Sequence, residues 1–345
     1  MNIGSARQAA VNWVTSHGSQ CPGYLGAYFS GSTVPLPDNA MLPPASDVDI
    51  VLVTQEVPSI KLGKFRYQNV LLEVTYLPWD LFDSVEKVLT NYHLAGSFRT
   101  NTIIADPYSR LYPIYQQVSQ HYAQKSWVEK RCKNALHKIE AGLQSIDMTL
   151  PLYDRITALL FPAAITTHVL LTAALQNPTV RLRYLRVREV LAQYNQLPVY
   201  TELLQLLGCD QMTAEQVRQH LEQLEITFDT AADVSSTPFF FSSDITVSAR
   251  PIVIEGSREL IESGNHLEAV FWIAATFARC HKILDADASP ETKQSLAPAF
   301  QALINDLGIG TPEDYLNRAG QILNYLPALS KTADDIINAH PQIWS

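Results

Sequence analysis

The chain has 345 residues, of which 47% are hydrophobic and 17% charged. This composition is typical of a folded globular protein and excludes a disordered or fibrous one, and the length predicts two or three domains. The formal net charge of −9, from 25 Lys and Arg against 34 Asp and Glu residues, disfavours a protein that binds the backbone of a nucleic acid.

The first elements expected along the chain are a helix and a strand. Apolar residues recur at helical spacing from Ala6 to Val14 and predict a helix over residues 5–17 that ends at Gly18. Residues 24–29 are typical of a strand. The sheet of the protein is therefore expected to begin near residue 24.

A turn of small residues follows this strand, with the sequence Ser30-Gly31-Ser32-Thr33. Gly31 allows a tight turn and a close approach of the backbone to a ligand. Backbone N–H groups at Gly31 and Ser32, with the hydroxyl groups of Ser30 and Thr33, are suited to the oxygens of a triphosphate. We expect these four residues to bind a nucleotide.

Two carboxylates stand at the start of the next expected strand, residues 47–54. Side chains in a strand alternate between its faces, so Asp47 and Asp49 share one face. Together they can bind a hard divalent cation. The pair therefore predicts a metal site beside the small-residue turn.

A third carboxylate, Glu73, lies within an apolar strand expected over residues 70–77, and residues 61–67 are expected to pair with that strand. The same alternation puts Glu73 on the polar face of its strand. Further along, a helix is expected over residues 79–90 and a short last strand over residues 102–107.

The order Gly31-Ser32, spacer, Asp47-Val48-Asp49, with Glu73 downstream, resembles the nucleotidyltransferase superfamily related to polymerase beta. The layout is most similar to antibiotic-modifying members such as kanamycin nucleotidyltransferase. The resemblance covers about the first third of the chain and implies an α+β fold with a mixed sheet. One departure is the spacer over residues 34–44, whose four prolines exclude the helix that many members have there.

The remainder of the chain is expected to be helical. We predict a catalytic domain over residues 1–120 and an all-α region over residues 121–345, within which residues 235–255 are a candidate boundary between two parts. Helices are expected from Trp127 onward, and over 154–175, 179–194, 199–207, 213–224, 257–263, 266–284, 291–306, 312–324 and 331–339, with irregular chain at 237–244 and 250–255. A basic run, Arg181, Arg183, Arg186 and Arg188, is expected to form a solvated face.

The resemblance implies a Mg²⁺-dependent transferase that moves a nucleoside monophosphate to a hydroxyl group of a small molecule. The expected group is AMP, taken from ATP. Two Mg²⁺ ions would be bound by Asp47, Asp49 and Glu73, and ATP or another nucleoside triphosphate would be the donor. Glu73 is either a metal ligand or the base for the acceptor hydroxyl. An aminoglycoside-like antibiotic is one acceptor class, and the acceptor is expected between the sheet and the helical region, which should cover the carboxylates.

Two other functions stay open: a regulatory module that binds a nucleotide without catalysis, and nucleotidylation of a protein or RNA partner. The expected partners are a nucleotide and a small acceptor, with no nucleic acid and no membrane, and the oligomeric state is open. The four cysteines form no C-x-x-C pair, and residues 1–7 contain no apolar run, which predicts free thiols and a cytoplasmic location. The uncharged run from Ile156 to Leu175 is expected to be a core helix rather than a membrane span.

Overall fold

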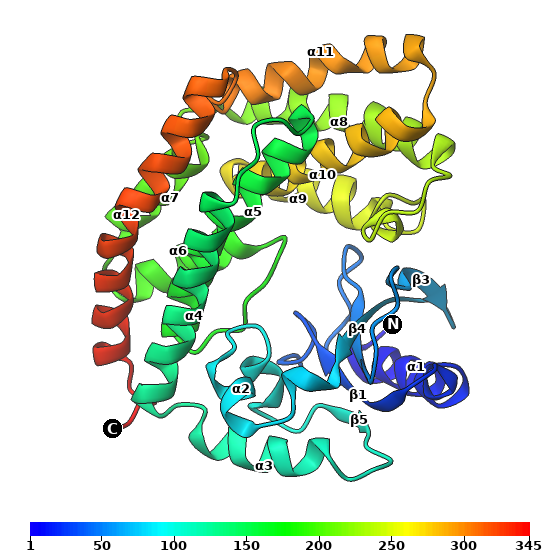
Figure 1. The fold of residues 1–345 in the computed structure, drawn as a ribbon, viewed down its shortest axis with the longest axis vertical. Helices are drawn as coiled ribbons and strands as arrows, with labels where there is room; N and C mark the ends of the chain where they lie inside the picture. The colour runs from blue at the N-terminus through cyan, green and yellow to red at the C-terminus, as the bar shows by residue number, and fades with distance from the viewer.

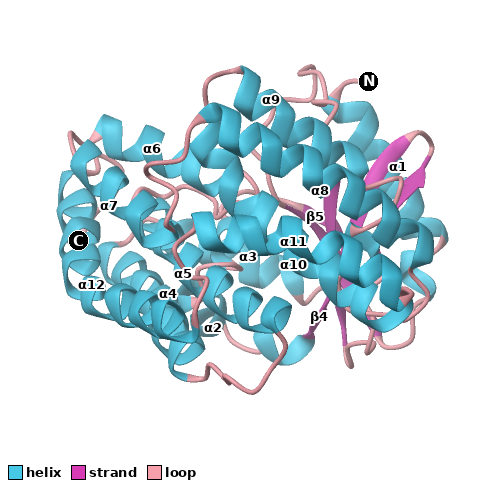
Figure 2. Cartoon of the chain, turned by 90° about the horizontal axis from the view of Figure 1, so that it is seen from above, coloured by secondary structure: helices cyan, strands magenta, loops and turns pink.

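The structure is a computed structural model that describes residues 1–345 and has an α+β fold (Figure 1). One five-stranded mixed sheet lies in the first third of the chain, and the region after it is helical. The predicted fold class is therefore confirmed. Seen from above, the sheet lies at one end of the molecule and helices α6, α7 and α12 at the other (Figure 2).

The sheet has the strand order β3-β4-β2-β1-β5. Only β2 and β4 are parallel, and the other neighbours are antiparallel. The strands are β1 (Tyr24–Ser30), β2 (Val48–Thr54), β3 (Gly63–Tyr67), β4 (Val70–Pro78) and β5 (Ile103–Ala105). Each expected strand is present, with its ends within about two residues of the prediction.

The two faces of the sheet carry alternate residues of the same strands. Helix α1 (Ile3–Ser16) covers one face, where Ile50 and Leu72 form an apolar layer with Trp13 and other residues of the helix. On the opposite face, Tyr28 and Val51 belong to a larger core that continues into the helices. The carboxylates extend from this second face.

The chain between β4 and the helical region is more broken than expected. In place of one helix over residues 79–90, a 3-10 turn at Trp79–Leu81 is followed by α2 (Val85–Thr90). Ser84 causes the new start, because its hydroxyl caps α2 by accepting a hydrogen bond from the backbone N–H of Lys87. A further 3-10 turn at Ala95–Phe98 and helix α3 (Leu111–His121) complete this part.

The proline-rich spacer contains no helix, as its composition predicts. Arg7 of α1 holds the spacer in place. Its guanidinium donates hydrogen bonds to the carbonyl oxygens of Thr33, Val34 and Leu36, and pairs with Asp38 at 2.6 Å. The turn beside the carboxylates is thereby fixed to the helix on the other side of the sheet.

Nine helices follow. They are α4 (Lys125–Gln144), α5 (Leu152–Ala173), α6 (Arg183–Gln193), α7 (Leu197–Leu207), α8 (Ala214–Val234), α9 (Gly256–Glu262), α10 (His266–Asp287), α11 (Pro290–Asp306) and α12 (Pro312–Ala339). Helix α5 is long and apolar enough to cross a membrane, but 72% of its most apolar window is buried inside the protein. The prediction of a core helix is confirmed.

Two expectations for the helical region were wrong. Residues 312–324 and 331–339 belong to the single helix α12, which continues through Pro327 because Leu326 and Leu329 on either side of it stay in the core. Residues 250–255 are not irregular, since Pro251–Glu255 forms a π-helical turn that runs into α9. Apolar packing outweighed the signal of Pro327, whereas Pro251 stands at the first position of its turn, where proline is well tolerated.

Candidate metal centre

The centre of the site is a row of four side chains across four neighbouring strands. Ser30 of β1 is paired with Asp49 of β2, Asp49 with Glu73 of β4, and Glu73 with Lys64 of β3. The parallel register of β2 and β4 is what brings Asp49 and Glu73 together. Asp47, two residues before Asp49, extends from the same face.

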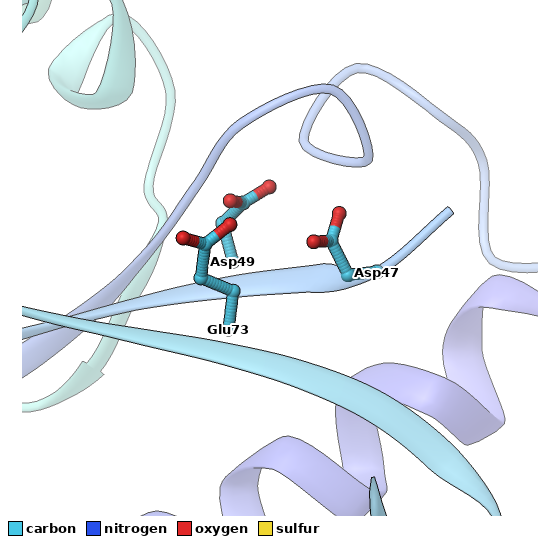
Figure 3. A group of neighbouring side chains, drawn as sticks. All are labelled: Asp47, Asp49 and Glu73. Carbon is cyan, nitrogen blue, oxygen red and sulfur yellow. The ribbon is translucent and has the colours of Figure 1, made fainter. Parts of the chain in front are cut away.

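Asp47, Asp49 and Glu73 form one cluster, in which a carboxylate oxygen of each lies within 4.8 Å of the other two. Figure 3 shows the two aspartates rising from one strand and Glu73 from its neighbour, all on the same side. Oxygen ligands at this spacing suit Mg²⁺ or a similar hard cation. The three residues predicted from the sequence are therefore brought together in a group that can hold a metal ion.

Gly31 leaves the space that Asp49 occupies. Its φ angle is +74°, and a Cβ atom at this position would lie 1.7 Å from Oδ2 of Asp49. Any other residue would displace that carboxylate and would also strain the backbone. The small-residue turn and the aspartates therefore form a single site.

The electrostatics differ among the three carboxylates. Burial raises the pKa of Asp49 well above its usual value, and the negative charges of Asp47 and Glu73 raise it further. Burial also raises the pKa of Asp47, although the nearby Lys64 partly offsets this shift. Asp49 in particular lacks a cationic partner, which a bound metal ion would supply.

Two lysines lie beside the cluster. Lys64 Nζ is 3.1 Å from Asp47 Oδ2 and also contacts Glu73, while Lys61 Nζ is 2.8 Å from Glu73 Oε1. Burial acts to raise the pKa of Glu73, but the charges of Lys64 and Lys61 outweigh it and lower that pKa to about 2. The Glu73 side chain is thus held ionised.

A fourth carboxylate, Asp244, reaches the site from the helical region. Lys64 Nζ lies 3.2 Å from its Oδ1, Lys61 Nζ lies 3.7 Å from its Oδ2, and Arg279 donates a hydrogen bond of 3.0 Å to Oδ2. Figure 1 shows the segment that carries it, between α8 and α9, descending toward β3. Sequence reasoning missed Lys64 and Asp244.

Lys64 and Asp244 were missed for different reasons. Lys64 stands opposite Glu73 in the expected strand pair, so the alternation of β3 could have revealed it. Asp244 lies in a segment expected to be irregular, about 170 residues from Glu73, and no local pattern marks it.

The loop between α5 and α6 approaches the small-residue turn from the other side. Asn177 donates a hydrogen bond to the carbonyl oxygen of Gly31 at 3.3 Å, and Arg181 donates to that of Ala45 at the same distance. With Asp244, these contacts confirm the expectation that the helical region covers the carboxylate face.

A cavity of about 700 Å³ lies between this loop, α6 and the small-residue turn. Gly31 and Ser32 line it on the sheet side, and Asn177, Arg186 and Glu189 line it on the helical side. The volume falls within the range of small-molecule sites, which is about 300 to 1,000 Å³. A ligand in this cavity would contact both parts of the protein.

The remaining predicted binding residues lie near the turn but differ in exposure. Ser32 is exposed, whereas the hydroxyl of Ser30 is 3.2 Å from that of Ser97. Thr33 is 2% exposed and is not among the residues that line the cavity. Gly31 and Ser32 are therefore the members of this group that line the cavity, and Gly31 also lies against the carboxylate of Asp49.

The basic run of α6 is not a solvated face, contrary to expectation. Arg183 is 2% exposed and lies over the ring of Phe271, and Arg188 pairs with the buried Glu268. Arg186 alone behaves as expected, with an exposed side chain paired to Glu189. Arg183 and Arg188 were missed because their partners, Phe271 and Glu268, lie in α10, about 80 to 90 residues further along the chain.

No protein-family model matches this chain, and no curated protein matches it in sequence.

Proposed function

We propose that this protein is a nucleotidyltransferase that uses Mg²⁺ and transfers AMP from ATP to a hydroxyl group of a small molecule. One observation carries the proposal: Asp47, Asp49 and Glu73 converge within 4.8 Å beside a glycine turn that has no room for a Cβ atom. Three carboxylates and a close backbone turn are what a metal-bound triphosphate needs.

In the proposed reaction, the acceptor oxygen forms a bond to the α-phosphorus, the bond to the β-phosphate oxygen breaks, and pyrophosphate leaves. The acceptor hydroxyl gives up its proton to solvent water in the process. When bound, Mg²⁺ would neutralise charge on the triphosphate and stabilise the attacking and leaving oxygens. Asp47, Asp49 and Glu73 would hold it, and Ser32 would contact phosphate oxygens from the turn.

For Glu73, the electrostatics favour the role of ligand over that of base. A carboxylate with a pKa of about 2 accepts a proton poorly at neutral pH. The same ionised group, already fixed by two lysines, is a ready oxygen ligand. Asp49, in contrast, has a pKa raised well above its usual value, so it accepts a proton more readily than Glu73.

The cavity next to Gly31 and Ser32 is the proposed site of the nucleoside and of the acceptor. It is bounded by two arginines, Arg99 and Arg186, and by Glu189. Arg99 suits phosphate oxygens. Glu189 is paired with Arg186 at 2.8 Å on the surface, so a cationic acceptor such as an amino sugar would bind Glu189 by replacing that pair.

The test is mass spectrometry of the full chain incubated with ATP, Mg²⁺ and a panel of hydroxylated small molecules that includes aminoglycosides. We expect an acceptor with the mass of one AMP added, together with pyrophosphate, and neither product with Asp49→Asn. The protein is analysed in the same samples.

The other outcomes discriminate the alternatives. AMP attached to a protein, either this chain or an added partner, would favour nucleotidylation of proteins. Binding of ATP without any transfer product would favour a regulatory module. Equal activity of Asp49→Asn and the unaltered chain would contradict the catalytic assignment. The proposal also carries the expectation of a cytoplasmic enzyme.

A further inference from the structure

Lys64 occupies an unusual position for a lysine beside a metal site. Its ammonium group contacts three carboxylates, Asp47 and Glu73 of the sheet and Asp244 of the helical region. Only 9% of the side chain is exposed. An ammonium group has three N–H donors, so each of the three carboxylates can take one.

A divalent cation bound by Asp47 and Glu73 would compete with Lys64 for these two carboxylates. With the metal on Asp47 and Glu73, two positive centres would lie a few ångströms apart in a mostly buried site. Even with an effective dielectric constant of about 20, their repulsion is many times the thermal energy. Lys64 must therefore move, or the metal must bind weakly.

The structure contains a place for the displaced ammonium group. Asp244 Oδ1 already lies 3.2 Å from Lys64 Nζ as an ion pair, but it accepts no hydrogen bond, although the residue is only 6% exposed. Its other oxygen accepts a hydrogen bond from Arg279. Lys64 can therefore give up its contacts with the sheet and keep Asp244 as its partner, with a hydrogen bond in place of the present ion pair.

We propose that Lys64 competes with the divalent cation for Asp47 and Glu73, and that Asp244 receives its ammonium group when the cation binds. The proposal rests on the metal site of the proposed function. Lys64 belongs to β3 and Asp244 to the segment between α8 and α9, so the exchange would move contacts of Lys64 from the sheet to the helical region.

The test measures Mn²⁺ binding to the full chain without nucleotide, by the paramagnetic resonance signal of free Mn²⁺. Lys64→Met should tighten binding by about tenfold or more. The control is Lys130→Met, which removes the same charge from an exposed lysine that pairs with Glu86 on the surface, and should change binding less than about twofold. Unchanged or weaker binding by Lys64→Met overturns the proposal.

Lys61→Met is the second variant. Lys61 contacts Glu73 and Asp244 but not Asp47, and its side chain is 21% exposed. It should tighten Mn²⁺ binding by more than Lys130→Met changes it, a result that can be obtained even if the Lys64 variant folds poorly, and by a smaller factor than Lys64→Met. If Lys61→Met changes Mn²⁺ binding no more than Lys130→Met does, or weakens it, competition by these lysines is contradicted.

A double-mutant cycle tests whether Asp244 affects metal binding through Lys64 or directly. Asp244→Asn should weaken Mn²⁺ binding in the unaltered chain, where Lys64 needs a new partner, and should have much less effect when Lys64 is already Met. Equal weakening in both backgrounds would make Asp244 a direct contributor to the metal site and would overturn the transfer of Lys64.

Failure of this inference and failure of the proposed function give different results. Mn²⁺ binding that depends on Asp49 but is insensitive to Lys64→Met overturns the competition and leaves the metal site intact. Absence of binding that depends on Asp49, in both the unaltered chain and Lys64→Met, overturns the metal site and with it both proposals.

Discussion

The two faces of the sheet are built from alternate residues of the same strands, yet at the end where the carboxylates lie one face is apolar and the other is charged. The face against α1 is an apolar layer in which Ile50 and Leu72 are fully buried. The opposite face holds three carboxylates and two lysines, all drawn together at one end of β2 and β4. Asp49 and Ile50 are neighbours in sequence and belong to these two different environments.

One face of the sheet therefore stabilises the fold, and the other carries the charged groups of the site. The apolar layer gains free energy from burial without requiring partners for charge. The polar face holds carboxylates whose burial and mutual repulsion oppose folding, so it depends on the stability supplied by the other face. Substitutions on the two faces should therefore have opposite effects on stability and binding.

Asp49→Asn should give the largest change. The amide is neutral and binds Mg²⁺ poorly, so transfer should fall by more than the roughly 10- to 100-fold that follows loss of an outer-shell partner of a metal. The fold should persist, and without metal its stability should rise. Product formation and urea unfolding check the two effects, and a variant that lost both activity and stability would contradict the division between the faces.

Ile50→Ala should show the converse pattern. Removal of a fully buried side chain should lower the free energy of unfolding by about 2 to 5 kcal/mol. Under conditions where the variant is folded, Mn²⁺ affinity should stay within about twofold of that of the unaltered chain, because the carboxylates extend from the other face. Urea unfolding and Mn²⁺ titration test this, and a large loss of Mn²⁺ affinity in the folded variant would show that the faces are coupled.

Gly31→Ala should affect both properties at once. The new Cβ atom would meet Asp49 Oδ2, so Mn²⁺ binding should weaken by about tenfold or more. The matched control is Gly264→Ala, at a glycine with φ +80° and nothing within 4 Å of the added atom, which should cost only the backbone strain of about 1 to 2 kcal/mol. Equal losses of stability, with Mn²⁺ binding intact in both variants, would show that the turn tolerates a side chain.

The smallest expected effect is the dependence of stability on pH without metal. The raised pKa of Asp49 means that, above the usual range of aspartate, the folded chain keeps a proton that the unfolded chain has lost. Stability contributed by this group therefore falls as pH rises, by at most about 1.4 kcal/mol per pH unit. Asp49→Asn should lack this decline, whereas Ile50→Ala should keep it.

Glu73 changes stability with pH in the opposite direction to Asp49, and over a lower pH range. Its pKa is lowered from 4.5 to about 2, so the stability it contributes is present above 4.5 and is lost as pH falls toward 2. Unfolding measured from pH 5 upward therefore leaves out Glu73. The buried histidines, whose pKa values are lowered by burial, contribute equally to the unaltered chain and to Asp49→Asn, so the difference between the two reports Asp49. A difference between the unaltered chain and Asp49→Asn that did not change with pH would contradict the raised pKa of Asp49.

The sequence by itself determined the elements and the direction of the side chains. Alternation in a strand puts Asp47 and Asp49 on one face, and Glu73 on the polar face of its own strand, whatever the rest of the chain does. The prolines of the spacer exclude a helix by their covalent structure. These are local properties, and the structure has all of them.

Only the tertiary structure decided which of these groups meet. The parallel register of β2 and β4 brings Glu73 beside Asp49, and the packing of the helical region brings Asp244 to Lys64. The same packing buries Arg183 against Phe271 and carries α12 through Pro327. Burial and pairing depend on segments far apart in the chain, whose contacts the whole core selects and no local pattern records.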